Sequence, residues 1–268
     1  MSNPTVVVVT GVSSGIGRTT AEQFARRGCR VFGTVRSIAR TAPVASVELI
    51  EMDVRDDASV QSGIRTIVER AARIDVLVNN AGTSLIGAVE ETSVVEAAAL
   101  FDTNVFSILR TVQAVLPHMR ARRGGRIVNV SSVLGFLPAP YMGLYAASKH
   151  AVEGLTETLD HELRQFGIRA TLVEPSFTRT SLDVNAPHAS AKIADYDRER
   201  TLAARAIVDN VKAAPEPDGV ARTIVEAALG AWRMRRAPSG EASLLSKLRR
   251  FMPAGPVDSS LRKKFRLG

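Results

Sequence analysis

The sequence predicts one α/β domain in which helices cover both faces of a doubly wound parallel sheet. First, strand-like apolar runs alternate with helical patterns at the spacing of βαβ units, whose strands are parallel. Second, the first run begins with four valines, which suit a strand buried on both faces. Third, the 268 residues are 45% hydrophobic and 23% charged, with no repeat or linker before residue 180, as expected for a single core.

Strands and helices are expected in alternation along the chain. The strands are residues 5–10, 29–35, 47–52, 74–78, 126–130 and 168–173. The helices are residues 18–27, 60–72, 93–122, 146–165 and 219–236, and Pro117 is expected to kink the third. Residues 181–218 have weak periodicity. We expect them to pack over the carboxyl edge of the sheet, where open α/β sheets bind ligands; an inert surface loop is the alternative.

The positive charge is concentrated at the C-terminal end. The formal net charge is +8 and the isoelectric point is about 10.2. From Leu244 onward, seven basic residues stand against one acidic residue, Asp258. We therefore divide the chain into a main domain, residues 1–240, and a basic tail, residues 241–268. The first interpretation of the tail is a solvated end. An amphipathic surface helix and a lid over a ligand site are the alternatives.

Composition and spacing also exclude several kinds of protein. No stretch approaches the roughly 18 apolar residues of a membrane span, and the valine run is too short for a signal-peptide core. We therefore expect a cytoplasmic protein, and the single cysteine, Cys29, excludes an intrachain disulfide. The four histidines lack metal-ligand spacing, so no metal site is expected.

Three glycines follow the first strand directly. Gly11, Gly15 and Gly17 would make a poor strand and a costly helix interior, so a bare backbone must be needed there. A glycine turn lets a pyrophosphate approach the backbone, and the next helix offers unpaired N–H groups and the positive end of its dipole. The pattern is informative because a strand precedes it and a helix follows it.

Four further motifs make residues 5–180 resemble the classical short-chain dehydrogenase/reductase family. Besides the turn Thr10-Gly-x-x-x-Gly-x-Gly17, the sequence contains Asn79-Asn-Ala-Gly82, Asn104, Ser132 after the fifth strand, and Tyr145-x-x-x-Lys149. The phrases V-T-G-V-S-S-G-I-G and L-Y-A-A-S-K-H-A-V-E-G-L are similar to the 17β-hydroxysteroid-dehydrogenase-like group. Two positions depart from the family pattern near the expected nicotinamide: Ser176 replaces a glycine and Thr178 replaces a valine.

The resemblance implies a Rossmann fold and an NAD(P)(H)-dependent oxidoreductase that interconverts an apolar ketone or aldehyde and its alcohol. The implied catalytic residues are Asn104, Ser132, Tyr145 and Lys149. The implied cofactor-binding residues are Gly11, Ser13, Ser14, Gly15, Ile16, Gly17, Arg36, Asp53, Val54, Asn80, Ala81, Gly82, Tyr145, Lys149, Pro175, Thr178 and Thr180. A cofactor-sensing regulatory or binding module with vestigial catalysis is the alternative.

Tyr145 and Lys149 lie four residues apart, so a helix places them on one face. A free phenol has a pKa of about 10, too high for ready proton exchange at neutral pH. We expect the ammonium to lower it. By resemblance, Tyr145 gives its proton to the carbonyl oxygen and Lys149 also holds the nicotinamide ribose. Ser132 would hydrogen-bond the developing alkoxide, and Asn104 would hold a water that links Lys149 to solvent.

The end of the second strand indicates the cofactor. NAD-preferring members of the family carry an aspartate there, which accepts the ribose hydroxyls. This sequence has Val35 and then Arg36, and a guanidinium can pair with a 2′-phosphate. We therefore expect NADP(H) to be preferred, with NAD(H) as the alternative. Asp53 and Val54 resemble the pair that brackets the adenine ring.

The substrate and the partners are less well defined. Seven residues are candidates for an apolar pocket or its closure, although ordinary core is the alternative: Leu134, Phe136, Leu137, Tyr141, Val184, Ile193 and Tyr196. The family resemblance implies a homodimer or homotetramer through helices 93–122 and 146–165. Leucines and phenylalanines interleave with the tail's basic residues. Nucleic acid is therefore not expected, and peripheral membrane contact by the tail is left open.

Overall fold

Seven parallel strands form one sheet in the computed structural model, which describes residues 4–248, 251 and 253–267. Their order is β3-β2-β1-β4-β5-β6-β7. The strands are β1 Val6–Thr10, β2 Arg30–Val35, β3 Val47–Glu51, β4 Val76–Asn79, β5 Gly125–Val130, β6 Ile168–Val173 and β7 Arg235–Arg236. Every pairing is parallel, which confirms the doubly wound sheet expected from the alternation of strands and helices.

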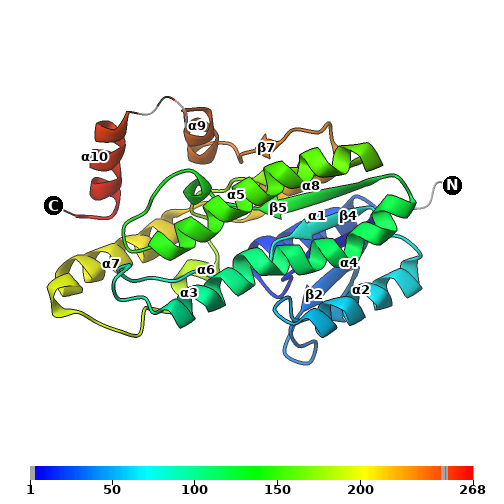
Figure 1. The fold of residues 1–268 in the computed structure, drawn as a ribbon, viewed down its shortest axis with the longest axis horizontal. Coiled ribbons are helices and arrows are strands. Elements are labelled where there is room, and N and C mark those ends of the chain that lie inside the picture. Colours follow the sequence, from blue (N-terminus) through cyan, green and yellow to red (C-terminus); the bar gives the residue numbers. More distant parts are fainter. Residues whose placement is uncertain (1–3, 249–250, 252, 268) are drawn as a thin grey trace.

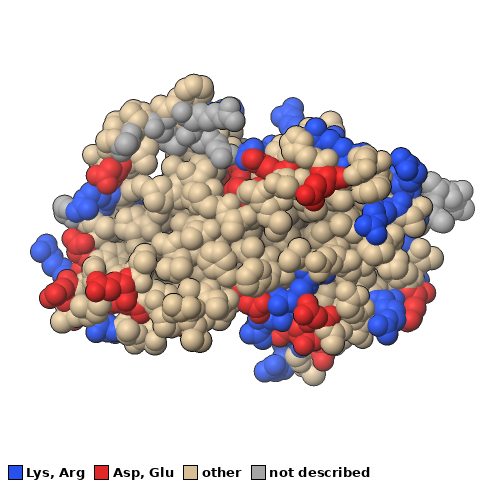
Figure 2. Space-filling model, viewed as in Figure 1, with Lys and Arg blue, Asp and Glu red and all other residues tan. Residues whose placement is uncertain are grey.

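Helices cover both faces of the sheet (Figure 1). They are α1 Gly15–Arg26, α2 Asp57–Ala71, α3 Val94–Phe101, α4 Ser107–Ala121, α5 Gly143–Leu163, α6 Ser181–Val184, α7 Asp197–Ala213, α8 Asp218–Leu229, α9 Glu241–Leu248 and α10 Ala254–Lys264. Helices α2, α4 and α5 pack on one face, and α1 and α8 pack on the other. Figure 2 shows that Lys, Arg, Asp and Glu gather toward the ends and edges of the α4–α5 face and leave its middle uncharged.

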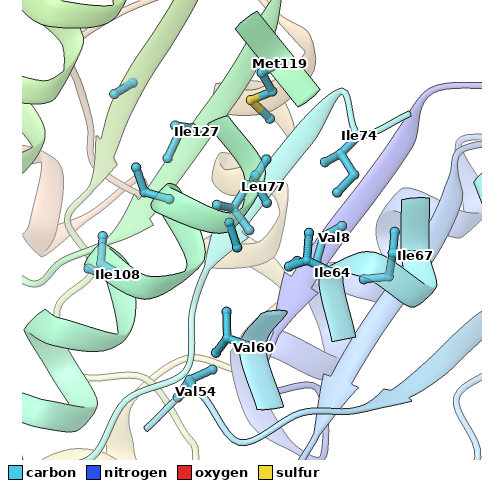
Figure 3. Packing of buried hydrophobic residues seen from close by; sticks show 14 of the residues in the cluster. Val8, Val54, Val60, Ile64, Ile67, Ile74, Leu77, Ile108, Met119 and Ile127 are labelled. Carbon is cyan, nitrogen blue, oxygen red and sulfur yellow. The ribbon is translucent and has the colours of Figure 1, made fainter. Parts of the chain in front are cut away.

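The core on the α4–α5 side is built from β-branched and aliphatic side chains (Figure 3). Val8 of β1 and Leu77 of β4 pack beneath Ile64 of α2, and Ile127 of β5 continues the layer toward α4. Val8 lies opposite Leu77 in the sheet register, so both side chains leave the same face. This packing fixes the strand ends from which the functional residues project.

Two predicted helices end differently in the structure. The helix expected over 219–236 stops at Leu229, and Arg235–Arg236 pairs with β6 as a seventh strand. The helix expected over 93–122 is interrupted by a π-helical turn, Asp102–Phe106, between α3 and α4. Ser93 caps α3 through a reciprocal capping box with Glu96. The π-helical turn shifts the helical phase at Asn104, and such turns occur often at functional sites.

The chain switches direction between β1 and β4. From β1 it proceeds to β2 and β3 on one side, and β4, β5 and β6 lie on the other. A crevice therefore opens at the carboxyl ends of β1 and β4, the usual ligand position in this architecture. Helices α6, α7, α9 and α10 lie beyond the carboxyl edge, at the left of Figure 1. Among the described residues, none of the helices combines the length and apolar character needed to cross a bilayer.

Candidate active site

A cavity of about 830 Å³ lies over the carboxyl edge of the sheet. It is lined by every residue expected to bind cofactor, from the glycine turn through Thr180. Three of the four expected catalytic residues also line it: Ser132, Tyr145 and Lys149. Asn104 does not line the cavity. One continuous space thus connects the glycine turn to the Tyr145 hydroxyl region.

The glycine turn has the bare backbone that its sequence predicts. Gly11 and Gly15 have φ values of +72° and +55°, in the left-handed region that favours glycine. Gly17 has no space for a side chain, because a Cβ atom there would lie 2.2 Å from Gly11 O and 2.4 Å from Asn80 Nδ2. The turn therefore packs tightly on the end of β4, with the N-terminus of α1 facing the cavity.

Asn80 ties the ends of β1 and β4 together. Its Nδ2 donates to Thr10 O at 2.9 Å and to Gly11 O at 3.2 Å. In return, Thr10 Oγ1 accepts from the backbone N–H groups of Asn80 and Ala81, each at 3.0 Å. These bonds stabilise the ends of β1 and β4 beside the cavity.

The far end of the cavity carries paired charges. Arg36, exposed at the end of β2, lines the cavity together with Asp53. Arg55 donates to both Asp53 carboxylate oxygens, at 3.0 and 2.7 Å, and this pairing lowers the pKa of Asp53 to about 2. The bare turn, the helix N-terminus and the cationic Arg36 together fit a phosphate-containing dinucleotide. The residues that would hold it are therefore in place.

Tyr145 and Lys149 lie on α5, and both are buried, as their spacing predicts. Lys149 Nζ donates to Val130 O at 2.9 Å and lies 5.7 Å from the centroid of the Tyr145 ring. Burial lowers the pKa of Lys149 to about 8, and the carboxylates of Asp183 and Glu153 limit the fall. The lysine therefore carries most of its charge at neutral pH but releases a proton readily above it.

The expected effect of the ammonium on the phenol is not what the structure shows. Burial raises the pKa of Tyr145 far above its ordinary value, the Asp183 carboxylate adds to the rise, and a hydrogen bond from Ser132 offsets part of it. Lys149 directs its Nζ at Val130 O, and desolvation of the buried phenol is the largest cause of the raised pKa.

Ser132 and Asn104 are both held by backbone groups. Ser132 Oγ accepts from Leu134 N at 3.1 Å and lies 3.4 Å from Pro175 O. Asn104 Oδ1 accepts from Thr83 N at 2.8 Å, and its Nδ2 donates to Thr83 O and to Ser148 Oγ. The π-helical turn thus directs Asn104 into the wall behind Lys149, where it fixes the chain after β4.

The apolar end of the cavity differs in part from the expected pocket. Leu134 and Leu137 line it as expected, and Phe177, Met142 and Leu261 join them. The other expected side chains do not line it: Phe136, Tyr141, Val184, Ile193 and Tyr196. Tyr141 and Tyr196 instead contact each other edge to face, on the outer side of this region. The segment 181–218 contributes through α6, with Ser181, Leu182 and Asp183, and through Pro187.

The basic tail forms a wall of the cavity, so the solvated end that was the first interpretation is wrong. Phe265 is 1% exposed and packs with Leu267 in the cluster that contains Tyr145. Ser246 of α9 donates to Glu174 at 2.8 Å, and Arg266 pairs with Asp209 of α7 at 2.8 Å. Leu245, Pro256, Val257, Leu261 and Phe265 all line the cavity. Packing of the tail's apolar residues therefore holds the tail against the cavity.

Ser84 and Asp183 are among the polar residues of the cavity wall that were not predicted from the sequence. Ser84 follows the Asn-Ala-Gly motif, and Asp183 lies in the short helix after Thr180. No spacing rule applies to either, since one is in a loop and the other in a segment of weak periodicity. The two departures from the family pattern, Ser176 and Thr178, both line the cavity, and Thr178 Oγ1 donates to Ser176 O at 3.0 Å.

Comparison with known proteins agrees with the fold. Residues 5–191 match the family model for short chain dehydrogenase. The 3-ketodihydrosphingosine reductase of Bacteroides thetaiotaomicron is 38% identical over 182 residues, covering 68% of this chain and 67% of that protein. Mouse 17-beta-hydroxysteroid dehydrogenase type 1 is 38% identical over 193 residues, and the aligned region covers 67% of this chain and 56% of the mouse protein. Bovine retinol dehydrogenase 8 is 36% identical, and the aligned region covers 95% of this chain and 88% of the bovine protein.

A solved structure agrees as well. A short chain dehydrogenase/reductase from Burkholderia phymatum, in complex with NAD, superposes with a TM-score of 0.80 at 32% identity, covering 92% of each chain. The hydroxysteroid-dehydrogenase-like relationship expected from the sequence is confirmed by the mouse relative. The chain therefore belongs to the short chain dehydrogenase family and is an oxidoreductase that binds NAD(P) and acts on CH–OH donors.

Proposed function

We propose that the protein is an NADPH-preferring carbonyl reductase that interconverts an apolar ketone or aldehyde and its alcohol, with Tyr145 as the general acid and base. One observation carries the proposal. Tyr145, Ser132 and Lys149 line the middle of a cavity that has a phosphate-binding turn at one end and an apolar wall at the other. A substrate carbonyl in the apolar half would lie beside these three polar side chains.

Reduction uses the proton that burial keeps on Tyr145. Because the pKa of the phenol is raised, Tyr145 is protonated at neutral pH and can donate to a carbonyl oxygen. A bound reduced nicotinamide would supply the hydride for the carbonyl carbon. The Ser132 hydroxyl, which faces the phenol, would hydrogen-bond the same oxygen as its negative charge develops.

Lys149 would restore the proton and hold the cofactor's ribose. Its pKa of about 8 suits proton exchange near neutral pH. Its Nζ has two further donors besides the one directed at Val130 O, and these can reach hydroxyl groups in the cavity. Asn104 then acts as a positioning residue, because its hydrogen bonds hold Thr83 and Ser148 behind this lysine.

The NADPH preference rests on Arg36. It lines the cavity at the end of β2, where Val35 is buried and offers no carboxylate to repel a 2′-phosphate. Asp53 is the nearest acidic residue of this wall, and Arg55 already neutralises it. Arg36→Asp should reverse the ratio of kcat/KM for NADPH and NADH. An unchanged ratio would show that the guanidinium does not select the cofactor.

The substrate class follows from the apolar wall and the relatives. Leu134, Leu137, Met142 and Leu261 would contact carbon rather than polar groups. The relatives are named for a hydroxysteroid, a retinol and a ketodihydrosphingosine, all hydroxyl or keto compounds. Bulky or long-chain ketones are therefore the first compounds to test.

The test is NADPH oxidation by the purified protein against a panel of apolar ketones. Turnover that Tyr145→Phe lowers at least a hundredfold, with NADPH affinity unchanged, is the expected result. Phenylalanine keeps the ring and its packing, so a folding defect would not explain the loss. If NADPH binds but none of the ketones turns over, the reductase proposal fails and the cofactor-sensing module remains.

We also propose two contacts beyond the substrate. The uncharged middle of the α4–α5 face in Figure 2, with exposed Phe106 and Leu109 at its end, suits a homodimer or homotetramer interface. The outer side of α9 carries exposed Leu244 and Leu248 beside Lys247, and this face suits an anionic lipid surface. Leu245, the residue after Leu244, lines the cavity, so such a surface would lie close to the substrate end.

A further inference from the structure

Two buried polar atoms in the cavity wall lack partners. Ser84 Oγ and Asp183 Oδ1 are inaccessible to solvent, and neither has a partner at ordinary hydrogen-bond distance and angle within the part of the chain that the structure describes, although the Ser84 hydroxyl lies near enough to the Asp183 carboxyl to lower its pKa. Both residues line the cavity that contains Tyr145 and Lys149. Buried polar groups in native proteins are nearly always satisfied, so unsatisfied ones in a binding cavity indicate a ligand that is to satisfy them.

The fold brings these two residues together by a local pairing. Ile86, two residues after Ser84, forms a parallel bridge with His188, five residues after Asp183. Ile86 N donates to Pro187 O at 3.0 Å, and Ala189 N donates to Ile86 O at 2.8 Å. The loop after β4 and the segment after α6 are thus joined, and Ser84 and Asp183 face the cavity from adjacent parts of its wall.

The Asp183 carboxylate acts on the reactive end of the cavity. It raises the pKa of Tyr145 and that of Lys149, so it lies within electrostatic range of both. Burial raises its own pKa, and the Ser84 hydroxyl and the Lys149 ammonium offset part of the rise. Asp183 Oδ1 has no hydrogen-bond partner among the described residues, so it remains for a further donor.

We propose that Asp183 and Ser84 form a subsite for the ammonium group of an amino ketone or amino alcohol, adjacent to the carbon that Tyr145 serves. An ammonium has three donors, which can satisfy the carboxylate and the hydroxyl at once, whereas a hydroxyl group has one. Hydrogen bonds between two charged groups are also about twice as strong as neutral ones. A hydrocarbon at this position would leave the carboxylate desolvated and unpaired.

The rest of the cavity limits the substrate further. Leu134, Leu137, Leu245, Leu261 and Phe265 line the space toward the tail, and an alkyl chain would contact them. The subsite therefore favours an amphiphile whose amino and carbonyl groups are adjacent and whose remainder is an alkyl chain. This inference rests on the proposed function, because it places the ammonium relative to the carbon that is oxidised or reduced.

The experiment compares matched alcohols in the oxidative direction. We would measure kcat/KM with NADP⁺ at pH 8.5 for 1-aminodecan-2-ol, decane-1,2-diol and decan-2-ol. The amino alcohol should exceed decan-2-ol by on the order of 10- to 100-fold, the range for a hydrogen bond to a charged group. Asp183→Asn should abolish this preference, which is measured as the ratio of kcat/KM for the amino alcohol to kcat/KM for decan-2-ol within the same variant. Ser84→Ala should reduce the preference in part.

Two outcomes would overturn the inference. A preference that Asp183→Asn leaves unchanged would show that the carboxylate does not contact the ammonium. Equal loss for all three alcohols in Asp183→Asn, with a shifted pH profile, would show that Asp183 acts only by positioning or charging Lys149. In both cases the reductase proposal stands, because decan-2-ol is still oxidised in a Tyr145-dependent manner.

A binding measurement separates this inference from the proposed function. Calorimetry of the NADP⁺ complex should give tighter binding of decylamine than of decan-1-ol, and Asp183→Asn should remove the difference. This comparison needs no turnover. If none of the alcohols is oxidised, the proposed function fails, while the decylamine result still decides whether the subsite binds an ammonium. Equal binding of the two ligands in the wild-type protein would refute the subsite.

Discussion

Replacing Gly17 by alanine tests the tight packing of the glycine turn. The new Cβ would lie 2.2 Å from Gly11 O and 2.4 Å from Asn80 Nδ2, well inside van der Waals contact. Gly11 O is a backbone atom held on the turn, and Asn80 Nδ2 is held by its bonds to Thr10 O and Gly11 O. The methyl group can therefore enter only if the turn or the asparagine moves.

The magnitude follows from these contacts. Overpacking a filled site costs about 1–3 kcal/mol. Loss of the two Asn80 hydrogen bonds adds about 1 kcal/mol each. Alanine in a helix regains about 0.5–1 kcal/mol over glycine. The free energy of unfolding should therefore fall by about 2–4 kcal/mol, which is less than the typical stability of a domain of this size.

Urea unfolding followed by circular dichroism would measure this change, at a fixed protein concentration so that assembly does not contribute. NADPH fluorescence titration should show at least a tenfold weaker Kd, because the displaced turn no longer presents its N–H groups. Gly219→Ala in α8 is the matched control, since no atom lies within 4 Å of its Cβ. A loss of stability below 0.5 kcal/mol (about the error of the method) with an unchanged Kd would refute the reasoning.

Three further predictions concern the buried lysine, the tail and the α4–α5 face. Lys149→Met should abolish turnover but keep or raise stability at pH 7. The pKa of Lys149 is about 8 in the folded protein and 10.5 for a free lysine, so folding penalises the charged amine by about 3 kcal/mol. The hydrogen bond from Nζ to Val130 O offsets part of this penalty. In the wild type this penalty should fall as pH rises from about 8 to 10.5. Leu244→Ser with Leu248→Ser should reduce co-sedimentation with anionic vesicles several-fold. Phe106→Lys should dissociate the oligomer in light scattering.

Each of these has its own control. For the lysine, Lys149→Met is the control: the stability of the wild type relative to this variant should rise between pH 8 and pH 10.5, and a difference that stays flat over this window would contradict the prediction. Leu229, at the end of α8, is an exposed leucine on a different part of the surface. Leu229→Ser should leave vesicle binding unchanged, and Leu229→Lys should leave the oligomer intact. Equal behaviour of the test and control variants would remove the lipid surface or the interface from the proposal.

Much of the fold and of the cofactor end of the site could be predicted from the sequence because their signals are local. A buried strand followed by Gly11, Gly15 and Gly17 specifies a turn by backbone sterics alone, and φ at two of these glycines agrees. The four-residue spacing of Tyr145 and Lys149 specifies one helix face wherever that helix packs. Parallel strands follow from the alternation itself.

Other features depended on neighbours far along the chain. Strand β7 consists of Arg235 and Arg236, which carry no strand pattern and become a strand only because β6 offers an unpaired edge. The basic residues of the tail predict a solvated end, but in the structure Phe265 packs in the hydrophobic cluster around Tyr145. Neither could be recognised without its partner element.

The sequence by itself determined the parallel α/β sheet, the glycine turn and the paired Tyr145 and Lys149, since each depends on backbone geometry over a few residues. Only the tertiary structure decided the charge state of the site and the shape of its substrate end. Burial, not proximity in sequence, raises the pKa of Tyr145 and lowers that of Lys149. A bridge between distant loops brings Ser84 to Asp183. Desolvation and long-range pairing are properties of the packed chain, so a local pattern cannot encode them.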